Sequence, residues 1–427
     1  MNADPVKTER IGKNAPITQN GESAMRKLLV LGGTYGQVPL IEAAKKEGYG
    51  VVLVDYTDDH PGIPLSDKHY QVSYMDRDAV LEIARQEDVA GVISNAEAAM
   101  PIVAYISEKR NLVGNPWESV LRVSSKNDFR ILQKEIGVYA PEHIVTNSFE
   151  EAQQQVSKLT FPIVIKPSRS YGSQGTTKVT DREMFEHCRE TWEICSEYSR
   201  DDQVVLEEYV ETLTPDRTIE GDVFVCNGQF LWDGLFTNKR SLKAPLVPMM
   251  DVFPILLEEE QLREVKETIE QLFRGAGIRF GQYNIEMFYT TGNRLFCIEI
   301  NPRQGGNGIP GLVQQHCGVD MYRLLVTTAM GDNGYFEEVL SHARSCRYIV
   351  RQMVFSHQDG IFREVYIAPE LKPYVTDVRV FPEPGDAVYA CCSAADIIAW
   401  VDLEFETREQ QISFLKMIEE EIYPICG

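Results

Sequence analysis

Two apolar runs separated by a short turn predict a β-hairpin over residues 280–303, and no other segment restricts the fold as strongly. The runs cover residues 284–289 and 295–300, and the segment between them begins with TTGN. Turn-forming residues between two apolar runs of strand length are typical of a hairpin. We expect residues 291–294 to form a four-residue loop and one face of the hairpin to pack against a core.

This loop determines which residues lie opposite each other in the hairpin. Thr290 then pairs with Leu295, and Glu286 lies opposite Glu299. Asn301 follows Glu299 by two residues and therefore lies on the same face of an extended chain. The apolar residues of the other face are expected in the core, namely Ile285, Met287, Ile298 and Ile300.

The two opposed carboxylates indicate a divalent cation. Like charges directly opposite each other destabilise a β-ladder, and a cation between them removes that repulsion. Glutamate and asparagine oxygens are the hard ligands that Mg²⁺ prefers, and Mg²⁺ usually completes its coordination with water and phosphate. We therefore predict a metal site at Glu286, Glu299 and Asn301, with Arg303 close to it. The alternative is a solvated sheet face that carries two glutamates.

The charge and the cysteines restrict partners and compartment. A formal net charge of −22 disfavours nucleic acids and anionic membranes, because both bind basic surfaces. No apolar stretch approaches the length of a membrane span. The nine cysteines include no CxxC pair, which is typical of free thiols in a reducing cytosol. We expect a cytoplasmic protein that binds neither nucleic acid nor membrane.

The N-terminal part of the chain predicts a Rossmann-like domain after a disordered leader. Residues 1–25 are polar and lack the apolar region of a secretory signal. A strand at 27–31, the turn GGTYG, a helix at 38–47 and a strand at 50–54 before Asp55 outline a dinucleotide fold. GGTYG departs from GxGxxG, so NAD binding is only a minor alternative to close packing of strand and helix. Further units, including a strand at 111–114, extend the domain to about Pro116.

Two charged residues at predicted element ends are candidates for ligand binding. Glu97 follows a strand at 91–94, and loops at the carboxyl ends of such strands bind ligands. It either contacts a substrate amine or serves as an acid at a helix N-terminus. Lys126 opens a predicted helix, where a cation is disfavoured, so it is either solvated or held for an anionic ligand.

A lysine and a loop of small residues predict a phosphate site. Lys166 ends a strand at 161–166 and lies on the face opposite Ile163 and Ile165. The loop PSRSYGSQGTT follows, and its backbone N–H groups suit phosphates. It lacks GK[ST] and precedes a strand at 176–179, so it is not a Walker A motif. We interpret it as a lid over nucleotide phosphates, although a flexible hairpin turn would look similar.

The segment after this loop adds candidates for adenine and ribose contacts. VVLEEYV at 204–210 is an apolar strand followed by two acids and an aromatic residue, and its backbone groups suit an adenine edge. Glu220, on a strand predicted at 218–227, is a candidate ribose contact. An ordinary edge strand would have a similar sequence.

A group of cations and a glycine run are further candidates for ligand contacts. Lys239, Arg240 and Lys243 form either a mobile substrate or phosphate loop or a solvated group of cations. The glycine run at 304–311, which includes Gly305 and Gly306, indicates backbone that approaches a ligand closely.

Taken in order, these segments resemble the ATP-grasp superfamily. The resemblance covers roughly residues 26–335 and rests on the glycine-turn domain, Lys126, IVIKPSRSYGSQGT, LEEYV and, most specifically, IEMFY…CIEINPRQGG. It implies an α/β fold with a Rossmann-like pre-ATP-grasp domain at 26–117 and a two-subdomain α+β ATP-grasp core at 118–335. A small C-terminal α/β domain would occupy 336–427.

The resemblance also implies a role for each candidate residue, with Lys166 and Arg303 acting at the transferring phosphoryl group. Glu207 would accept a hydrogen bond from the adenine amino group, and the segment 211–217 is longer than usual, which weakens the ribose assignment. The implied contacts are ATP with Lys126, Lys166, Ser173, Gly175, Glu207, Glu208, Val210 and Glu220, Mg²⁺ or Mn²⁺ with Glu286, Glu299 and Asn301, and substrate with Glu97, Arg303, Gly305 and Gly306.

The implied activity is that of an ATP-dependent carboxylate–amine ligase. A carboxylate attacks the γ-phosphate to give an acylphosphate, and an amine then displaces phosphate to give an amide. Such phosphoryl transfer depends mainly on positioning and charge neutralisation. The resemblance favours small amino-acid or dipeptide-type substrates and a homodimer. The alternatives are a carboxylase similar to biotin carboxylase or phosphoribosylaminoimidazole carboxylase, and a catalytically silent nucleotide-binding regulator.

Overall fold

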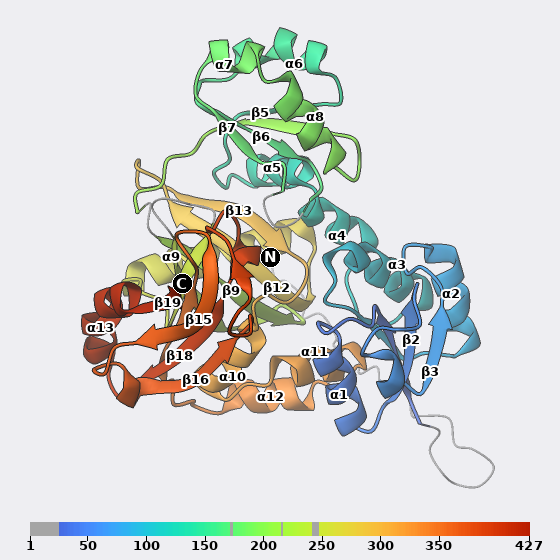
Figure 1. Cartoon of the computed structure of the whole chain (residues 1–427). Coiled ribbons are helices and arrows are strands. Elements are labelled where there is room, and N and C mark those ends of the chain that lie inside the picture. Colours follow the sequence, from blue (N-terminus) through green and yellow to red (C-terminus); the bar gives the residue numbers. More distant parts are fainter. Residues whose placement is uncertain (1–24, 171–173, 215–216, 241–246) are drawn as a thin grey trace, which may run out of the picture.

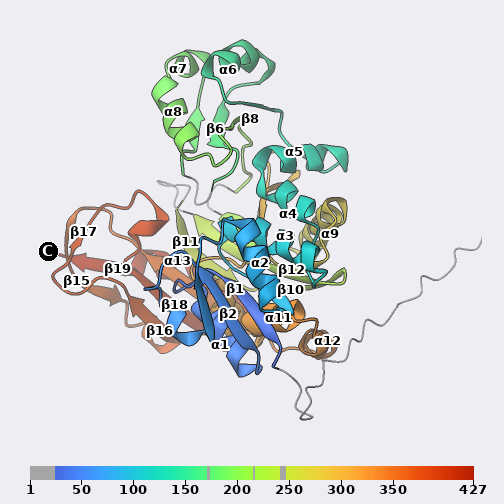
Figure 2. The ribbon, with the colours of Figure 1, turned by 90° about the vertical axis from the view of Figure 1, so that its right-hand side faces the viewer.

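The computed structural model describes residues 25–170, 174–214, 217–240 and 247–427. Almost the whole predicted leader therefore lies outside the described residues. The described chain is a mixed α/β structure with one parallel sheet and three antiparallel sheets, which matches the predicted fold class (Figures 1 and 2). Within these residues, no helix combines the length and apolar character that a membrane span requires.

The N-terminal sheet is parallel and doubly wound, as predicted. Its strands lie in the order β3-β2-β1-β4. Every residue of β2 is buried, which explains its continuous apolar run. The expected strand at 111–114 is absent, since Asn111 ends α3 with a φ of 54° and the chain turns there. The elements are β1 Lys27–Leu31, α1 Val38–Lys46, β2 Gly50–Asp55, β3 Lys68–Gln71, α2 Arg77–Gln86, β4 Gly91–Ile93 and α3 Met100–Arg110.

A small antiparallel sheet stands at the top of Figure 1, in the order β5-β8-β6-β7. Ile163 and Ile165 pack in its core with Phe185 and Trp192, so Lys166 projects from the other face, as predicted. Two helices, α7 and α8, lie between β7 and β8 in the sequence. The elements are α4 Trp117–Ser124, α5 Lys126–Glu135, β5 His143–Thr146, α6 Phe149–Gln155, β6 Ile163–Pro167, β7 Thr177–Val179, α7 Arg182–Glu186, α8 Arg189–Glu197 and β8 Val204–Glu208.

The largest sheet has eight strands in the order β13-β12-β9-β10-β11-β14-β18-β16. Helix α9 packs on one face through its apolar stripe, and α10, α11 and α12 pack on the other. Three strands come from residues after 336, so the sheet crosses the expected domain boundary, and the division into domains stays a prediction. The elements are β9 Arg217–Cys226, β10 Gln229–Arg240, β11 Pro248–Phe253, α9 Glu259–Ala276, β12 Phe280–Tyr289, β13 Leu295–Asn301, α10 Ile309–Cys317, α11 Met321–Ala329, α12 Gly334–Ser341, β14 Tyr348–Val354, β16 Val375–Val380 and β18 Ala399–Phe405.

The C-terminal part also contains a three-stranded sheet in the order β17-β15-β19. Helix α13 packs between this sheet and the large one, because Ile418 belongs to a core cluster with Val350, Leu403 and Ile422. The elements are β15 Gly360–Ile367, β17 Ala387–Val388, α13 Arg408–Glu421 and β19 Ile422–Cys426.

The hairpin β12–β13 confirms the expected pairing of Glu286 with Glu299, although the loop differs. Tyr289, rather than Thr290, pairs with Leu295. A bulge after Glu286 then shifts the register by one residue and restores the Glu286–Glu299 pair. The bulge also makes the core prediction wrong at one position. Cys297 occupies the buried position that we expected Ile298 to fill.

Helix α11 ties the large sheet to the N-terminal sheet. Val326, Ala329 and Met330 share a core cluster with Leu28 of β1 and Leu40 of α1. Figures 1 and 2 both place α11 beside α1. Arg323 of α11 also forms an ion pair with Glu47 at 2.7 Å. The N-terminal sheet therefore shares a core with α11, a helix that also packs on the large sheet.

Two glycines determine the local path of β9 and β10. The register of these strands shifts between Leu231 and Gly234. A β-carbon on Gly234 would lie 2.1 Å from the carbonyl oxygen of Asp222, and one on Gly221 would lie 2.0 Å from the carbonyl oxygen of Gly234. No side chain fits at such distances, so both positions require glycine. The acidic residues Glu220 and Asp222 flank Gly221, and their placement depends on this close approach.

We expect Gly234→Ala to lower the free energy of unfolding by ~2 kcal/mol or more, since the new methyl group forces the strands apart. The midpoint of urea denaturation, followed by circular dichroism, measures the loss. Gly292→Ala is the matched control, because its β-carbon would have its nearest neighbour at 3.7 Å in an exposed turn. The control is expected within ~0.5 kcal/mol of the wild type. Equal midpoints for Gly234→Ala and the control would contradict the assignment.

Candidate active site

Acidic side chains from three adjacent strands form the centre of the candidate site. The registers place Glu220 of β9 opposite Glu286 of β12, and Glu286 opposite Glu299 of β13. Asn301 Nδ2 donates to Glu299 Oε1 at 2.9 Å, so Asn301 Oδ1 remains for another partner. The three predicted metal ligands, Glu286, Glu299 and Asn301, therefore lie together, and Glu220 extends the row.

The donor set of this row suits a hard divalent cation. All of its available donors are carboxylate or amide oxygens, the type that Mg²⁺ selects. Among the described residues, no three His, Cys, Asp or Glu side chains form a ready metal cluster. The predicted set instead has an amide, Asn301, in the third position, with water and phosphate left to complete the coordination.

Arg240 neutralises part of the acidic row. Its Nη2 contacts Glu286 Oε1 at 2.8 Å and also bonds Glu220 Oε1. Lys239 instead forms an ion pair with Glu419 of α13, and Lys243 lies outside the described residues. Lys239 and Arg240 belong to strand β10, so the interpretation of this segment as a loop is wrong for both of them.

The pKa values of the two glutamates at the centre of the row, Glu286 and Glu299, are shifted in opposite directions. Burial raises the pKa of Glu286, and the charges of Glu220 and Glu299 raise it further against the opposing effect of Arg240. Burial also acts to raise the pKa of Glu299, but Lys126, the hydrogen bond from Asn301, and the charges of Arg303 and Lys166 outweigh it, so this pKa is lowered. Glu299 is therefore the acid that faces the cations of the site.

Lys126 connects helix α5 with the predicted phosphate loop. Its Nζ lies 3.3 Å from the carbonyl oxygen and 3.4 Å from Oγ of Ser170. Its backbone N–H donates to the carbonyl oxygen of Ser168 at 3.0 Å. Ser173 lies outside the described residues. Gly175 has a φ of 70°, and a β-carbon there would lie 3.2 Å from the Cα of Cys195, which explains the glycine.

Glu207 is buried between two cations. Its Oε1 accepts a hydrogen bond from Lys166 Nζ, and its Oε2 accepts one from Arg130 Nε at 3.0 Å. Burial acts to raise the pKa of Glu207, but Arg130 and Lys166 hold it at about 2. Burial lowers the pKa of Lys166 to about 8, although Glu207 opposes the shift. The predicted adenine contact would use the lone pairs that these two bonds leave on Glu207.

Arg130 was not among the predicted site residues. It is fully buried, its Nη1 donates to Gln133 Oε1 at 2.8 Å, and the guanidinium lies 4.8 Å from the centre of the Phe296 ring. Nη1 also lies 3.4 Å from the carbonyl oxygen of Cys297. Arg130 thus joins α5, β8 and β13, the elements of Lys126, Glu207 and Glu299. A charged residue on the buried stripe of an amphipathic helix was the available sequence signal.

The other predicted adenine contacts lie at the end of β8, where the chain makes hydrogen bonds within the protein. Glu208 Oε1 accepts a hydrogen bond from the backbone N–H of Thr160 at 2.8 Å. The backbone N–H of Tyr209 donates to the carbonyl oxygen of Pro162, and Val210 follows the end of β8. Adenine contacts by the Glu208 and Val210 backbones stay a prediction, as does the ribose contact of Glu220.

The predicted substrate residues Glu97 and Arg303 lie in direct contact. Arg303 Nη2 lies 3.0 Å from Glu97 Oε2, and Nε lies 3.3 Å from the same oxygen. Glu97 opens the short helix η2 Glu97–Ala99 after β4, and Arg303 follows β13. Nη1 of Arg303 donates to the carbonyl oxygen of Gln304 at 2.9 Å. The N-terminal domain therefore reaches the acidic row through this ion pair.

Asp222 explains the position of the glycine run and was missed from the sequence. The Gly305 N–H donates to Asp222 Oδ1 at 2.8 Å, and a β-carbon on Gly305 would lie 2.8 Å from the same oxygen. Burial raises the pKa of Asp222 to about 6, against hydrogen bonds from Asn284 and Gln282. Gly305 is therefore required by packing, whereas a β-carbon on Gly306 would meet nothing within 4 Å.

The acid that a dinucleotide site would require, Asp55, makes its contacts within the protein. Asp55 is buried, and its Oδ2 accepts a hydrogen bond from the backbone N–H of Gly33 at 2.6 Å. His60 Nδ1 lies 2.9 Å from the same oxygen. This arrangement gives Asp55 a role in holding the GGTYG turn and leaves the NAD alternative without support.

We expect Arg130→Met to lower the free energy of unfolding by ~3–5 kcal/mol, because it leaves one oxygen of the buried Glu207 carboxylate unpaired. Lys134→Met on the same helix is the control, since the Lys134–Glu142 ion pair is exposed and contributes less than ~1 kcal/mol. Both are measured from urea denaturation midpoints. A loss of similar size in the two variants would show that the Arg130 contacts do not support the fold.

Comparison with protein families and curated proteins agrees with this geometry. Residues 159–310 match the model of the ATP-grasp domain. An uncharacterised protein, y4rH, of Sinorhizobium fredii is 25% identical over 98% of this chain and 87% of its own length. The formate-dependent phosphoribosylglycinamide formyltransferase of Methanocaldococcus jannaschii is 25% identical over 68% of this chain and 72% of its own length.

Solved structures share the fold over nearly the whole chain. The L-amino acid ligase of Bacillus licheniformis superimposes with a TM-score of 0.75 at 20% identity, covering 94% of this chain and 99% of that one. The phosphoribosylglycinamide synthetase of Anaerococcus prevotii gives a TM-score of 0.68 at 19% identity, covering 94% and 100%. Residues 159–310 of this chain are therefore an ATP-grasp domain, and the fold of the chain around them is similar to that of an L-amino acid ligase.

Proposed function

We propose that this protein is an ATP-dependent ligase that activates a carboxylate as an acylphosphate and couples it to an amine. One observation carries the proposal. Lys126, Lys166 and Arg303, from three separate parts of the chain, all act on the pKa of Glu299. A triphosphate, a metal ion and a carboxylate need such a convergence of cations beside acids.

Lys126 and Lys166 would bind the phosphates of ATP, and Glu286, Glu299 and Asn301 would hold Mg²⁺ or Mn²⁺. When bound, the metal supplies charge neutralisation for phosphoryl transfer. The biotin carboxylase domain of the Hydrogenobacter thermophilus 2-oxoglutarate carboxylase, which shares the fold, was solved as a dimer with MgADP. These parallels support the nucleotide and metal assignments and a homodimer for this chain.

Arg303 would orient the substrate carboxylate toward the γ-phosphate. The carboxylate oxygen forms a bond to phosphorus, the bond to the β,γ-bridging oxygen breaks, and ADP leaves. The amine nitrogen then attacks the acyl carbon, phosphate leaves and the nitrogen loses a proton. In the present state Glu97 holds Arg303, so a substrate carboxylate would replace Glu97 as its partner.

A carboxylase is the second candidate, because N5-carboxyaminoimidazole ribonucleotide synthetase of Thermotoga maritima also shares the fold, with a TM-score of 0.66. We favour the amino-acid or peptide ligase, whose Bacillus licheniformis counterpart has the TM-score of 0.75. A silent regulator is disfavoured, since this chain has the complete row of acids and the cations that act on it.

Release of ADP and phosphate from ATP with Mg²⁺ and paired panels of amino acids tests the proposal. We expect release that requires both a carboxylate and an amine, with the amide detected by mass spectrometry. Release with bicarbonate alone, and with no amino-acid pair, would move the protein to the carboxylases. No release under any condition would favour the regulator.

Glu299→Gln is expected to reduce kcat at least 100-fold. A neutral amide binds the metal more weakly, and this metal would neutralise the charge of the transferring phosphoryl group. Glu260→Gln on the exposed surface of α9 is the control and should leave kcat unchanged. ADP release by the two variants at saturating ATP gives the comparison. Full activity in Glu299→Gln would remove the metal assignment.

The pKa of about 8 for Lys166 predicts a pH dependence of nucleotide binding. ATP binds the charged form, so its affinity should fall by about 25-fold as the pH rises from 7.5 to 9.5 and free Lys166 loses its proton. Arginine stays protonated over this range, so the affinity of Lys166→Arg should change by less than about twofold. Calorimetric titration with ATP and Mg²⁺ measures both. Parallel profiles would exclude Lys166 as the titrating group.

A further inference from the structure

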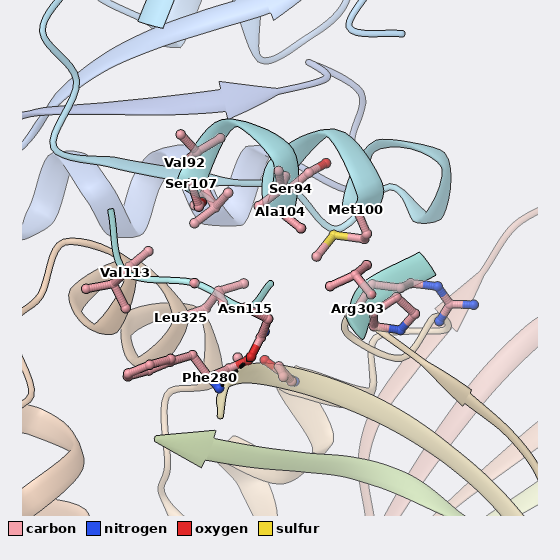
Figure 3. A pocket seen from close by; sticks show the side chains of 18 of the residues that line it. Val92, Ser94, Met100, Ala104, Ser107, Val113, Asn115, Phe280, Arg303 and Leu325 are labelled. Atoms are coloured by element: carbon pink, nitrogen blue, oxygen red, sulfur yellow. Dashed lines mark hydrogen bonds between the residues drawn. The ribbon is translucent and has the colours of Figure 1, made fainter. Parts of the chain in front are cut away.

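A cavity of about 60 Å³ lies between the N-terminal domain and the start of β12. Figure 3 shows Ala104 and Ser107 of α3 on one side of this cavity and Phe280 of β12 on the other. Leu325 and Thr328 of α11 complete the wall. Most of the lining is aliphatic or aromatic, so the cavity suits an apolar group.

Two hydroxyl groups in this wall lack a partner. Ser107 and Thr328 are 1% and 2% exposed, and within the described part of the chain neither Ser107 Oγ nor Thr328 Oγ1 has a hydrogen-bond partner. The adjacent Thr327 differs, because its Oγ1 bonds the carbonyl oxygen of Arg323 at 2.9 Å. Buried hydroxyls normally have a hydrogen-bond partner, because leaving one unpaired is unfavourable. The pair therefore indicates an occupant with a hydrogen-bonding atom.

The cavity adjoins the proposed substrate site. Arg303 and Ser94 belong to its lining, and Ser94 directly follows β4. Ligands of doubly wound sheets bind beyond the carboxyl ends of the strands. Arg303 is the one charged residue among the lining residues, and its guanidinium is already paired with Glu97. A charged group in the cavity would have no counter-ion and would be excluded by desolvation.

The size of the cavity limits the occupant. A space that holds one water takes at least ~10–15 Å³ on the same measure, so 60 Å³ corresponds to about four to six heavy atoms. Leucine and methionine side chains have this size. Glycine and alanine side chains would leave the cavity unfilled.

We propose that this cavity is the side-chain subsite for the substrate that binds at Arg303, and that it selects a neutral, mainly apolar side chain of about four to six heavy atoms. A methionine-like group, with an acceptor for the hydroxyls of Ser107 and Thr328, fits better than a purely aliphatic one. The inference rests on the proposed ligase activity, since it assigns specificity to the same site.

Ala104→Leu tests the subsite by filling it from α3. In the ADP-release assay, we expect kcat/KM for leucine and methionine to fall at least tenfold relative to alanine and glycine, since one or a few methylene groups change selectivity by this much. Lys109→Leu places the same leucine side chain on the exposed face of α3, away from the cavity, and should keep the wild-type ratio. An unchanged ratio in Ala104→Leu would overturn the proposal and leave the cavity a packing gap.

Ser107→Ala removes one hydroxyl group from the wall and leaves the cavity unfilled. It should reduce the preference for methionine over leucine several-fold and leave the ratio of leucine to alanine unchanged. An equal effect on every amino acid would show a structural disturbance rather than a subsite, and would count against the proposal. Calorimetric ATP binding, which should stay at the wild-type value in all three variants, verifies that the fold is intact.

A binding measurement separates failure of the subsite from failure of the proposed activity. The rise in melting temperature caused by L-methionine, L-leucine or glycine is measured with Mg²⁺ and a non-hydrolysable ATP analogue. If no amino-acid pair supports ADP release, but methionine stabilises the wild type and not Ala104→Leu, the activity is wrong and the subsite stands. If neither methionine nor leucine stabilises the wild type more than glycine does, the subsite is wrong.

Discussion

Electrostatic repulsion along the row Glu220–Glu286–Glu299 is the constraint on which the rest of the site depends. Three acids on adjacent strands destabilise the sheet unless positive charge faces them. Arg240 supplies that charge at one end of the row. Lys126, Lys166 and Arg303 supply it at the other end, where the pKa of Glu299 is lowered. The sheet therefore has a stable arrangement only when cations from several parts of the chain converge on it.

The ion pairs of Glu207 show how this convergence is held in place. Arg130 and Lys166 both bond the buried carboxylate, and Arg130 also reaches the backbone beside Glu299. The small sheet and the large sheet are thus connected under the site by charged groups rather than by apolar packing. Buried charges contribute less net stability than apolar residues of similar volume. These ion pairs therefore fix the relative positions of the two sheets more than they stabilise the fold.

The sequence predicted the centre of the site well because local patterns determine it. The pairing of Glu286 with Glu299 was correct even though the loop was misplaced, since a one-residue bulge cancelled the error. Such a bulge leaves no signal in residue alternation until the neighbouring side chains are placed. Arg130 and Asp222 were missed because their roles arise from contacts with residues about 80 positions away. No periodicity or motif within their own elements records such contacts.

The shared packing of α11 with the N-terminal sheet has a consequence for how substrates are recognised. Leu28 and Leu40 lie in one core with Val326, Ala329 and Met330, so the wall that carries Glu97 and the wall that carries Arg303 are fixed to each other before any ligand arrives. The small sheet has its own separate core. The interface between the N-terminal sheet and α11 is therefore preformed, whereas the small sheet packs around a core of its own. Single replacements beside Glu97 or Arg303 can therefore alter that side of the candidate site and leave the core of the small sheet unchanged.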